Sequence, residues 1–193
     1  MSKNLILFHK PYGVLCQFSG STPNLGTFIS IKGFYAAGRL DKDSEGLLAL
    51  TNSGLLQARI TEPRHKMSKS YWVQVEGECS LVALNALRSG LRLKDGMTRP
   101  LRADLIEAPL PERDPPVRVR KTQPTSWLNI TLKEGKNRQI RRMTAHVGHP
   151  TLRLFRHQIG PWGIDQLKPG AWSEHAVHLP QQPSRKNRPK QLL

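Results

Sequence analysis

Residues 34–60 read FYAAGRLDKDSEGLLALTNSGLLQARI and contain, in succession, signals for a strand, a polar turn, a second strand and a helix. Phe34–Ala37 is expected to lead as a strand into the turn, which places Asp41 at the end of an element. Leu47–Thr51 is apolar enough to form a buried strand, and Asn52-Ser53 then supplies an N-cap for the helix. The stretch therefore predicts strands and a helix packed together in one unit.

The flanking sequence adds more short strands and two more helices. Strands are expected at Leu5–His9, Val14–Phe18, Ser70–Val75, Leu101–Ile106, Trp127–Leu132, Leu152–Ile159 and Ala176–Leu179. Helices are expected at Ser80–Ser89 and Asn137–Val147, where apolar residues recur at helical spacing. The turn Lys10-Pro-Tyr-Gly13 predicts a hairpin of the first two strands, and the proline-rich residues 109–124 predict an exposed loop. Because the elements follow no regular βαβ order, the sequence favours an α+β fold with a largely antiparallel sheet.

Composition indicates a polyanionic partner. The chain of 193 residues carries 30 Lys and Arg against 14 Asp and Glu, and its formal net charge of +16 predicts salt-sensitive binding to nucleic acid. An anionic membrane surface would need a long amphipathic helix with one basic face, a pattern that the sequence lacks. The apolar runs are too short to span a bilayer and the first residues lack a secretory signal, so a soluble, cytoplasmic protein is expected. Cys16 and Cys79 have neither zinc-site nor disulfide spacing, and we expect buried free thiols.

Residues 38–46, GRLDKDSEG, place three carboxylates at alternate positions between two glycines in a very basic protein. An EF-hand calcium loop would use them as positions one, three and five, but its twelfth position is Asn52, which cannot supply the bidentate carboxylate. Solvated surface charge is the expected role of Lys42, Asp43 and Glu45. Asp41 differs because a carboxylate among cations could act as a nucleophile at a sugar carbon or as a general base.

The cations come chiefly from residues 136–142, KNRQIRR. Arg138, Arg141 and Arg142 lie within one turn of a helix whose apolar stripe is buried, which concentrates positive charge on one face. Each arginine could contact phosphate without any role in catalysis, although arginine forks also hold carboxylates. Tyr71 could stack on a flipped base, yet an aromatic residue in a strand is more often part of the core.

Four segments in order, KPYG at residues 10–13, GRLD at 38–41, KSY at 69–71 and EGKNRQIRRM at 134–143, resemble the ribosomal pseudouridine synthases that modify a single uridine. The resemblance runs from about residue 5 to residue 179 and includes LRLFRHQIGP at 152–161. It implies a two-lobed α+β catalytic module with a mixed, mainly antiparallel sheet and an RNA-binding cleft. It also implies that a uridine N-glycosidic bond breaks and that the uracil rejoins through carbon five, with no cofactor and no metal.

The same resemblance assigns roles to residues. Asp41 is implied as the catalytic aspartate, Tyr71 as the tyrosine that stacks on the target base, and Arg141 as the basic partner of the aspartate. Further residues implied to bind substrate are Arg39, Leu40, Lys69, Arg138, Arg142, Leu154 and Arg156, with Leu154 in an apolar pocket. The extrusion of the target nucleotide from its stack costs a few kcal/mol, and an aromatic face in the pocket would offset it.

Many relatives carry a small N-terminal RNA-binding domain, whereas here the KPYG turn comes almost at once. We therefore expect one catalytic domain over residues 1–180 and a basic, disordered tail at 181–193. The expected partner is large-subunit ribosomal RNA, bound by a monomer without membrane or obligate protein partner. A non-catalytic ribosomal RNA-binding protein would explain the charge but not Asp41 and Tyr71, and a metal-dependent nuclease would lack its remaining ligands.

Overall fold

The structure is a computed structural model that describes residues 3–65, 67–118, 120 and 122–179. Its strands are β1 (Leu5–Lys10), β2 (Tyr35–Ala36), β3 (Glu45–Thr51), β4 (Lys69–Glu76), β5 (Arg92–Leu93), β6 (Gly96–Met97), β7 (Arg102–Ile106), β8 (Thr125–Leu132), β9 (Thr151–Ile159), β10 (Trp162–Gly163) and β11 (Trp172–His175). The α-helices are α1 (Gly54–Thr61), α2 (Leu81–Ser89) and α3 (Gln139–His146), and short 3-10 turns lie at Leu25–Thr27 and Pro63–His65.

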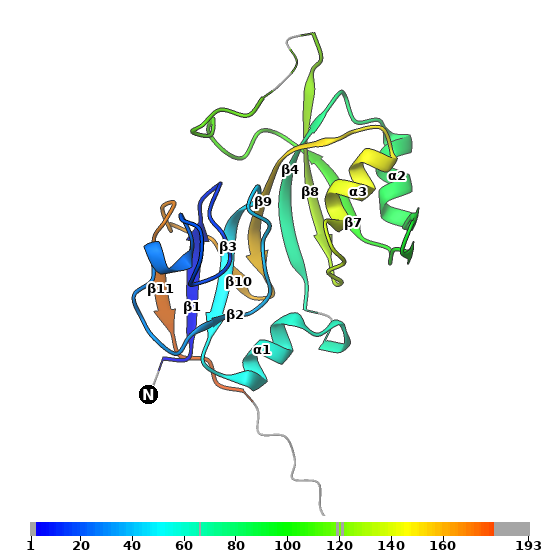
Figure 1. Cartoon of the computed structure of the whole chain (residues 1–193). Helices are drawn as coiled ribbons and strands as arrows, with labels where there is room; N and C mark the ends of the chain where they lie inside the picture. Colours follow the sequence, from blue (N-terminus) through cyan, green and yellow to red (C-terminus); the bar gives the residue numbers. More distant parts are fainter. Residues whose placement is uncertain (1–2, 66, 119, 121, 180–193) are drawn as a thin grey trace, which may run out of the picture.

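One sheet runs through two lobes in the order β11-β1-β3-β9-β4-β8-β7, as Figure 1 shows. The first lobe holds β11, β1, β2 and β3, and the second holds β9, β4, β8 and β7. All pairings are antiparallel except that of β3 with β9, which is parallel and joins the lobes. The predicted α+β class with a mixed, mainly antiparallel sheet is confirmed.

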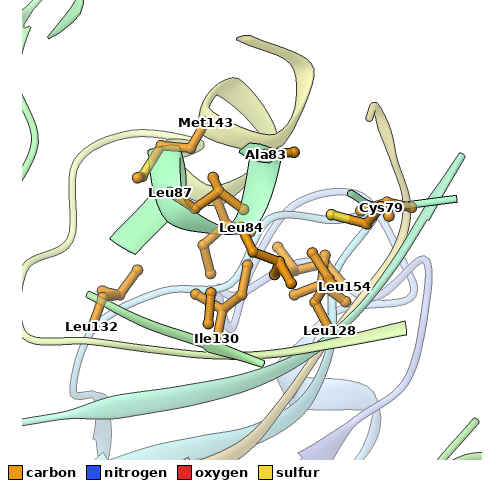
Figure 2. Packing of buried hydrophobic residues seen from close by; sticks show 13 residues of the cluster. Cys79, Ala83, Leu84, Leu87, Leu128, Ile130, Leu132, Met143 and Leu154 are labelled. Carbon is orange, nitrogen blue, oxygen red and sulfur yellow. The ribbon is translucent and has the colours of Figure 1, made fainter. Parts of the chain in front are cut away.

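Helices α2 and α3 cover one face of the second lobe. Figure 2 shows Leu84 and Leu87 of α2 and Met143 of α3 gathered over Leu128 and Ile130 of β8. Alternate residues of each strand point into this cluster, as expected for a sheet with one buried face. The hydroxyl of the residue before α2 accepts from the third N–H of the helix, a normal N-cap.

Strand β3 is buried along its whole length, because both faces of the first lobe are covered. Leu48 and Leu50 pack with apolar residues from the long segment between β1 and β2. Leu47 and Ala49 pack instead against α1 and the segment that follows β9. Residues after 46 are continuously apolar because both faces of this strand are buried.

Two predicted strands are wrong. Val14–Phe18 forms no strand and contributes only an isolated bridge from Leu15, because β1 already has a partner on each side in β3 and β11. The strand expected at Ala176–Leu179 lies earlier, at Trp172–His175, where it pairs with β1. Val177 follows that strand and bonds the side chain of Asn4 instead of a strand partner.

The connection between β7 and β8 forms neither helix nor strand in the parts of residues 107–124 that are described. It is not simply exposed, because the Arg113 side chain is largely buried against the first lobe. Figure 1 shows this connection reaching from the second lobe toward the first. No helix within the described ranges is long and apolar enough to cross a membrane. The tail predicted at 181–193 lies outside the described residues.

Candidate active site

Asp41 lies in the loop between β2 and β3, where the two lobes meet. The N–H of Ser44 donates to the Asp41 carbonyl at 3.1 Å, which closes a tight turn. The N–H of Gly13 donates to the Lys42 carbonyl at 2.9 Å, so the turn after β1 braces the loop. The carboxylate is thus carried by a turn that is fixed at both ends.

Gly46 lets this loop enter the sheet directly beside the second lobe. It pairs in register with Arg156 of β9, and a Cβ at residue 46 would overlap the main chain of Arg156. Its φ of 99° lies in the region that glycine favours. Glycine is therefore required here for both space and backbone conformation.

A buried ammonium supports the same region. Lys10 is fully buried, and its Nζ donates to the carbonyls of Val14 at 2.7 Å and Pro11 at 3.0 Å. Burial lowers the pKa of Lys10 to about 8, even though carboxylates nearby, including Glu45, favour the charged form. Lys10 thus holds the turn of residues 10–13 in a single conformation.

Arg138 joins the acidic loop to the second lobe. Its Nη1 donates to Asp41 Oδ2 at 3.1 Å, and its two terminal nitrogens bond the Asp43 carboxylate at 3.2 and 3.0 Å. Arg138 has a left-handed backbone, φ 45° and ψ 35°, which costs of order 1–3 kcal/mol in a residue with a side chain. Burial alone would raise the pKa of Asp43, but the Arg138 hydrogen bond and the Arg141 charge lower it. The strained arginine therefore contacts both aspartates at once and favours the ionised form of Asp43.

The prediction that Asp43 and Glu45 are solvated surface charges is wrong. Asp43 is half-buried in the contacts above, and Glu45 is 5% exposed. Arg153 makes a two-point contact with Glu45, Nε to Oε2 at 3.0 Å and Nη2 to Oε1 at 2.9 Å, and Arg113 approaches to 3.7 Å. The physical reason is that Glu45 opens β3, so it enters the sheet beside β9 instead of staying in the turn.

A cavity of about 360 Å³ opens beside Asp41, a size typical of ligand sites at roughly 300 to 1,000 Å³. Its walls bring together these predicted site residues: Arg39, Leu40, Asp41, Lys69, Tyr71, Arg138, Leu154 and Arg156. They come from the β2–β3 loop, β4, β9 and the start of α3, which are far apart in the sequence. Cationic side chains and apolar groups therefore surround the Asp41 carboxylate.

The apolar part of the wall lies where the two lobe cores touch. Tyr71 of β4 is half-buried and packs against the clusters of both lobes. Leu154 of β9 pairs with Val73, beside Tyr71, and is 7% exposed. Leu40 is also buried, and its N–H donates to the Cys16 thiol at 3.3 Å. Cys16 and Cys79 are buried free thiols, as predicted.

Lys69 and Arg156 add charge to the interior of this cavity. Burial, followed by the neighbouring Arg156 charge, lowers the pKa of Lys69 to about 8. Arg156 is 4% exposed, and its Nε donates to the Leu47 carbonyl at 2.7 Å. Its buried Nη2 has no hydrogen-bond partner in the described part of the chain, which leaves one donor beside the cavity unused.

Arg141 and Arg142 do not line the cavity. The expected pairing of Arg141 with the Asp41 carboxylate is not formed. Its Nη2 donates instead to the Asp43 carbonyl at 2.8 Å and lies 3.4 Å from Asp43 Oδ2. Arg142 forms a two-point contact with Asp95, at 2.7 and 3.0 Å, on an exposed surface. Of the three arginines, Arg138 is therefore the one that contacts Asp41.

Residues 133–139 form a further part of the cavity wall, and the sequence motifs predicted a site residue there only at Arg138. The buried Glu134 carboxylate accepts from the Arg99 N–H at 2.8 Å and from the Gln139 side chain. The Gln139 side-chain oxygen accepts from the Lys136 N–H at 3.0 Å. Glu134 and Gln139 both lie in the segment EGKNRQ at residues 134–139. A single glutamate among so many cations is the sequence signal that could have identified this part of the wall.

The arrangement favours chemistry by one carboxylate with cationic and aromatic support. Among the residues that are described, no cluster of three or more His, Cys, Asp or Glu side chains could hold a metal ion. Asp43 and Glu45, which a calcium or nuclease site would need, are bound by arginines. Asp41 can therefore approach an anionic substrate whose phosphates contact the surrounding cations.

Comparison with known proteins gives consistent results. Residues 4–146 match the family described as RNA pseudouridylate synthase. The chain is 53% identical over 181 residues to ribosomal large subunit pseudouridine synthase E of Vibrio vulnificus, covering 92% of this chain and 76% of the relative. It is 57% identical over 174 residues to the protein of the same name from Xanthomonas campestris pv. campestris, covering 87% and 93%. A crystal structure of a pseudouridylate synthase matches with a TM-score of 0.77 at 25% identity, covering 91% of this chain and 71% of the other.

Proposed function

The chain belongs to the RNA pseudouridylate synthase family, and we propose that it converts one uridine of large-subunit ribosomal RNA to pseudouridine with Asp41 as the catalytic carboxylate. The family makes the protein an RNA-modifying isomerase. The observation that carries the role of Asp41 is its position in a cationic cavity, with Arg138 at 3.1 Å from its carboxylate. The large-subunit substrate follows the names of the relatives.

In this mechanism the bond between uracil N1 and the ribose breaks, and a bond from uracil C5 to the same ribose carbon forms. C5 loses its proton and N1 gains one once it is detached from the ribose, so the isomerisation balances without a cofactor. An ionised Asp41 attacks the sugar or assists departure of the base, and both routes need the carboxylate oxygen free of a proton. Arg138 donates a hydrogen bond to Asp41 Oδ2 at 3.1 Å and so holds this carboxylate in place beside the cavity.

The target uridine must leave its stack before Asp41 can reach the sugar. Extrusion costs a few kcal/mol, which an aromatic contact in the cavity offsets in part. Tyr71 provides that contact, and Leu154 the apolar floor next to it. Lys69, Arg39 and the unused nitrogen of Arg156 then bind the phosphates and the uracil oxygens.

Residues 1–180 act in this proposal as one catalytic domain, because the sheet is continuous through both lobes. The substrate places the protein with ribosomal RNA in the cytoplasm. The chain works as a monomer without an obligate protein partner. Gel filtration with light scattering would detect a dimer and correct this part.

The decisive experiment compares Asp41→Asn with Asp104→Asn. The first removes a charge at nearly constant volume, and the second does so at an exposed aspartate that pairs with Arg88 outside the cavity. Pseudouridines are mapped in ribosomal RNA from cells with and without the protein, and each purified variant is then given RNA that lacks the modification. Asp41→Asn should bind the RNA and form no pseudouridine, while Asp104→Asn works normally. Near-normal turnover by Asp41→Asn would show that another group performs the chemistry.

A further inference from the structure

A second hollow borders the contact between Asp41 and Arg138. Its volume is about 750 Å³, within the range of roughly 300 to 1,000 Å³ found for ligand sites. It shares part of its wall with the first cavity, through Arg39, Leu40, Asp41, Asn137 and Arg138. The rest of its wall comes from residues 12, 13, 15 and 16 after β1 and from the acidic loop, at Lys42 and Asp43. A ligand in this hollow would therefore lie next to the reacting carboxylate.

Tyr12 is the aromatic residue in the wall of this hollow. It retains 37% of its exposed area, although it sits on a turn that is otherwise firmly held. The Lys10 ammonium bonds the carbonyls on both sides of the turn, at Pro11 and Val14, and the Gly13 N–H bonds the acidic loop. A large aromatic ring that stays exposed on a firmly held turn is available to contact a ligand.

One face of the Tyr12 ring is already covered. The Arg113 guanidinium carbon lies 3.7 Å from the ring centroid, a close cation–π contact. Arg113 is itself anchored by the buried Glu45 carboxylate at 3.7 Å, and only 10% of its side chain is exposed. Because Arg113 comes from the β7–β8 connection, the second lobe fixes the orientation of a ring in the first. Tyr12 lines the hollow whereas Arg113 does not, so the covered face of the ring is not closed by a wall of the hollow.

We propose that this hollow is a second base-binding subsite, in which Tyr12 stacks on a nucleobase directly adjacent to the target uridine. The inference rests on the function proposed above and adds a specificity element to the same site. A nucleotide extruded to Asp41 carries its chain neighbour along the shared wall, and a detached base needs a flat partner to replace the stacking it has lost. Arg138 already binds the acidic groups of the wall, so the ring is the main new contact for a base.

A phosphate is a poorer occupant of this subsite. The hollow is lined by Asp41 and Asp43 as well as by cations, and Arg138 is engaged by both carboxylates. Little net positive charge therefore remains to attract an anion, whereas the binding of an uncharged base does not depend on net charge. Stacking also tolerates any base, so the subsite would select for an unpaired neighbour more than for a particular sequence.

The test uses an RNA fragment that contains the uridine mapped as modified by the wild-type protein, with an abasic nucleotide at its 5′ or its 3′ neighbour. Binding and single-turnover rate are measured for wild type, Tyr12→Ala, Tyr12→Leu and Tyr12→Phe. Tyr35→Ala is the matched control, because Tyr35 is 66% exposed on β2 and lines neither cavity. Wild-type binding should weaken roughly tenfold for one of the two abasic RNAs. Tyr12→Ala and Tyr12→Leu should bind intact RNA more weakly by about the same factor, and Tyr12→Phe and Tyr35→Ala should bind it almost as tightly as the wild type.

Non-additivity is the critical result. Tyr12→Ala should bind the sensitive abasic RNA no worse than it binds intact RNA, because the stacking contact is already absent. If Tyr12→Ala loses as much further affinity on the abasic RNA as the wild type does, Tyr12 acts only through the fold. If the wild type binds both abasic RNAs as tightly as intact RNA, no base occupies the hollow. Either result overturns the subsite. The wild-type arm works even if a variant fails to fold. Absence of pseudouridine formation by the wild type would instead refute the proposed function itself.

Discussion

At the scale of single residues, the three arginines near the acidic loop have different roles. Arg138 contacts the Asp41 carboxylate, Arg141 bonds the main chain at Asp43, and Arg142 pairs with Asp95 away from both cavities. Composition alone cannot separate them, because all three are consecutive or nearly so on one amphipathic helix. The separation depends on the left-handed backbone of Arg138, which turns its side chain back over the loop before α3 begins.

Arg138→Lys should lower the rate of pseudouridine formation by roughly tenfold, since an ammonium cannot bond both aspartates in the planar geometry of a guanidinium. Arg142→Lys is the matched control, because its carboxylate partner lies outside both cavities. Single-turnover rates at saturating RNA separate this effect from weaker binding. Equal rates for the two variants would mean that the contact of Arg138 with Asp41 and Asp43 does not affect the reaction.

Lys10 predicts a pH effect on stability. Burial lowers the pKa of this lysine from 10.5 to about 8 in the folded chain. Between these values the unfolded chain binds more protons than the folded one, so stability rises with pH from about 8 to 10.5. Below pH 8 the cost of burying the ammonium, about 3 kcal/mol, is fully present. The free energy of unfolding of the wild type relative to Lys10→Met should therefore increase from pH 7.5 to pH 10 in urea titrations. A constant difference would contradict the lowered pKa.

Only some of the site residues could be predicted from the sequence. The motifs identified Asp41, Tyr71 and Leu154, and the fold brings all three to one cavity. They did not identify Glu45 as buried or Tyr12 as part of a hollow, because Glu45 is bound by Arg153 of β9 and the hollow is completed by residues 137 and 138, both far along the chain. Contacts between segments that distant leave no local periodic pattern in a sequence.

At the scale of elements, the parallel pair of β3 and β9 is the critical junction. It is short, with register partners at Glu45 and Gly46, and it carries the acidic loop on one strand. The buried contact of Glu45 with Arg153 lies at its start, and Arg153 Nη1 also donates to the Pro111 carbonyl at 2.8 Å. One carboxylate therefore links β3, β9 and the β7–β8 connection.

Glu45→Gln should destabilise the protein by about 3 to 5 kcal/mol, because it leaves the buried Arg153 guanidinium without its counter-charge. The double variant Glu45→Gln with Arg153→Met should recover part of this loss, since the guanidinium with the two-point contact to Glu45 is then gone and only Arg113 still lacks its counter-charge. Urea unfolding of both variants and of the single Arg153→Met variant completes the cycle. Glu45→Gln within 1 kcal/mol of wild type would return Glu45 to the solvated role that the sequence suggested.

The elements that were predicted correctly are those whose signals are local. The helical spacing gave α2 and α3, the cap at Asn52-Ser53 gave α1, and continuous or alternating apolar residues gave β3, β4 and β8. The hairpin after β1 failed because Pro11 and Gly13 do form a turn, but the chain beyond it packs as irregular structure on the first-lobe core. The last strand was displaced by a few residues for a similar reason, because apolar character at Val177 reports burial and not strand pairing.

At the scale of the whole molecule, the cations behind the net charge of +16 are unevenly distributed between the cavity and ion pairs elsewhere. The cavity beside Asp41 is lined by six Lys or Arg side chains, at residues 39, 69, 133, 136, 138 and 156, against two carboxylates, at residues 41 and 134. Many other cations are already bound, such as Arg153 by Glu45 and Arg88 by Asp104. Electrostatic affinity for RNA should therefore be concentrated along the seam between the lobes, where the sheet passes from β3 to β9.

This concentration predicts which charges control the salt dependence of RNA binding. The logarithm of the association constant should fall linearly with the logarithm of salt concentration, and each lost phosphate contact should reduce the slope by about 0.7 to 0.9. Arg39→Gln removes an exposed cation shared by both cavities, whereas Lys168→Gln removes an equally charged, exposed residue that lines neither. Binding of the same RNA fragment across a salt series should show the smaller slope for Arg39→Gln alone. If both variants lower the slope equally, RNA contacts the molecule broadly, and the seam has no electrostatic preference over the rest of the surface.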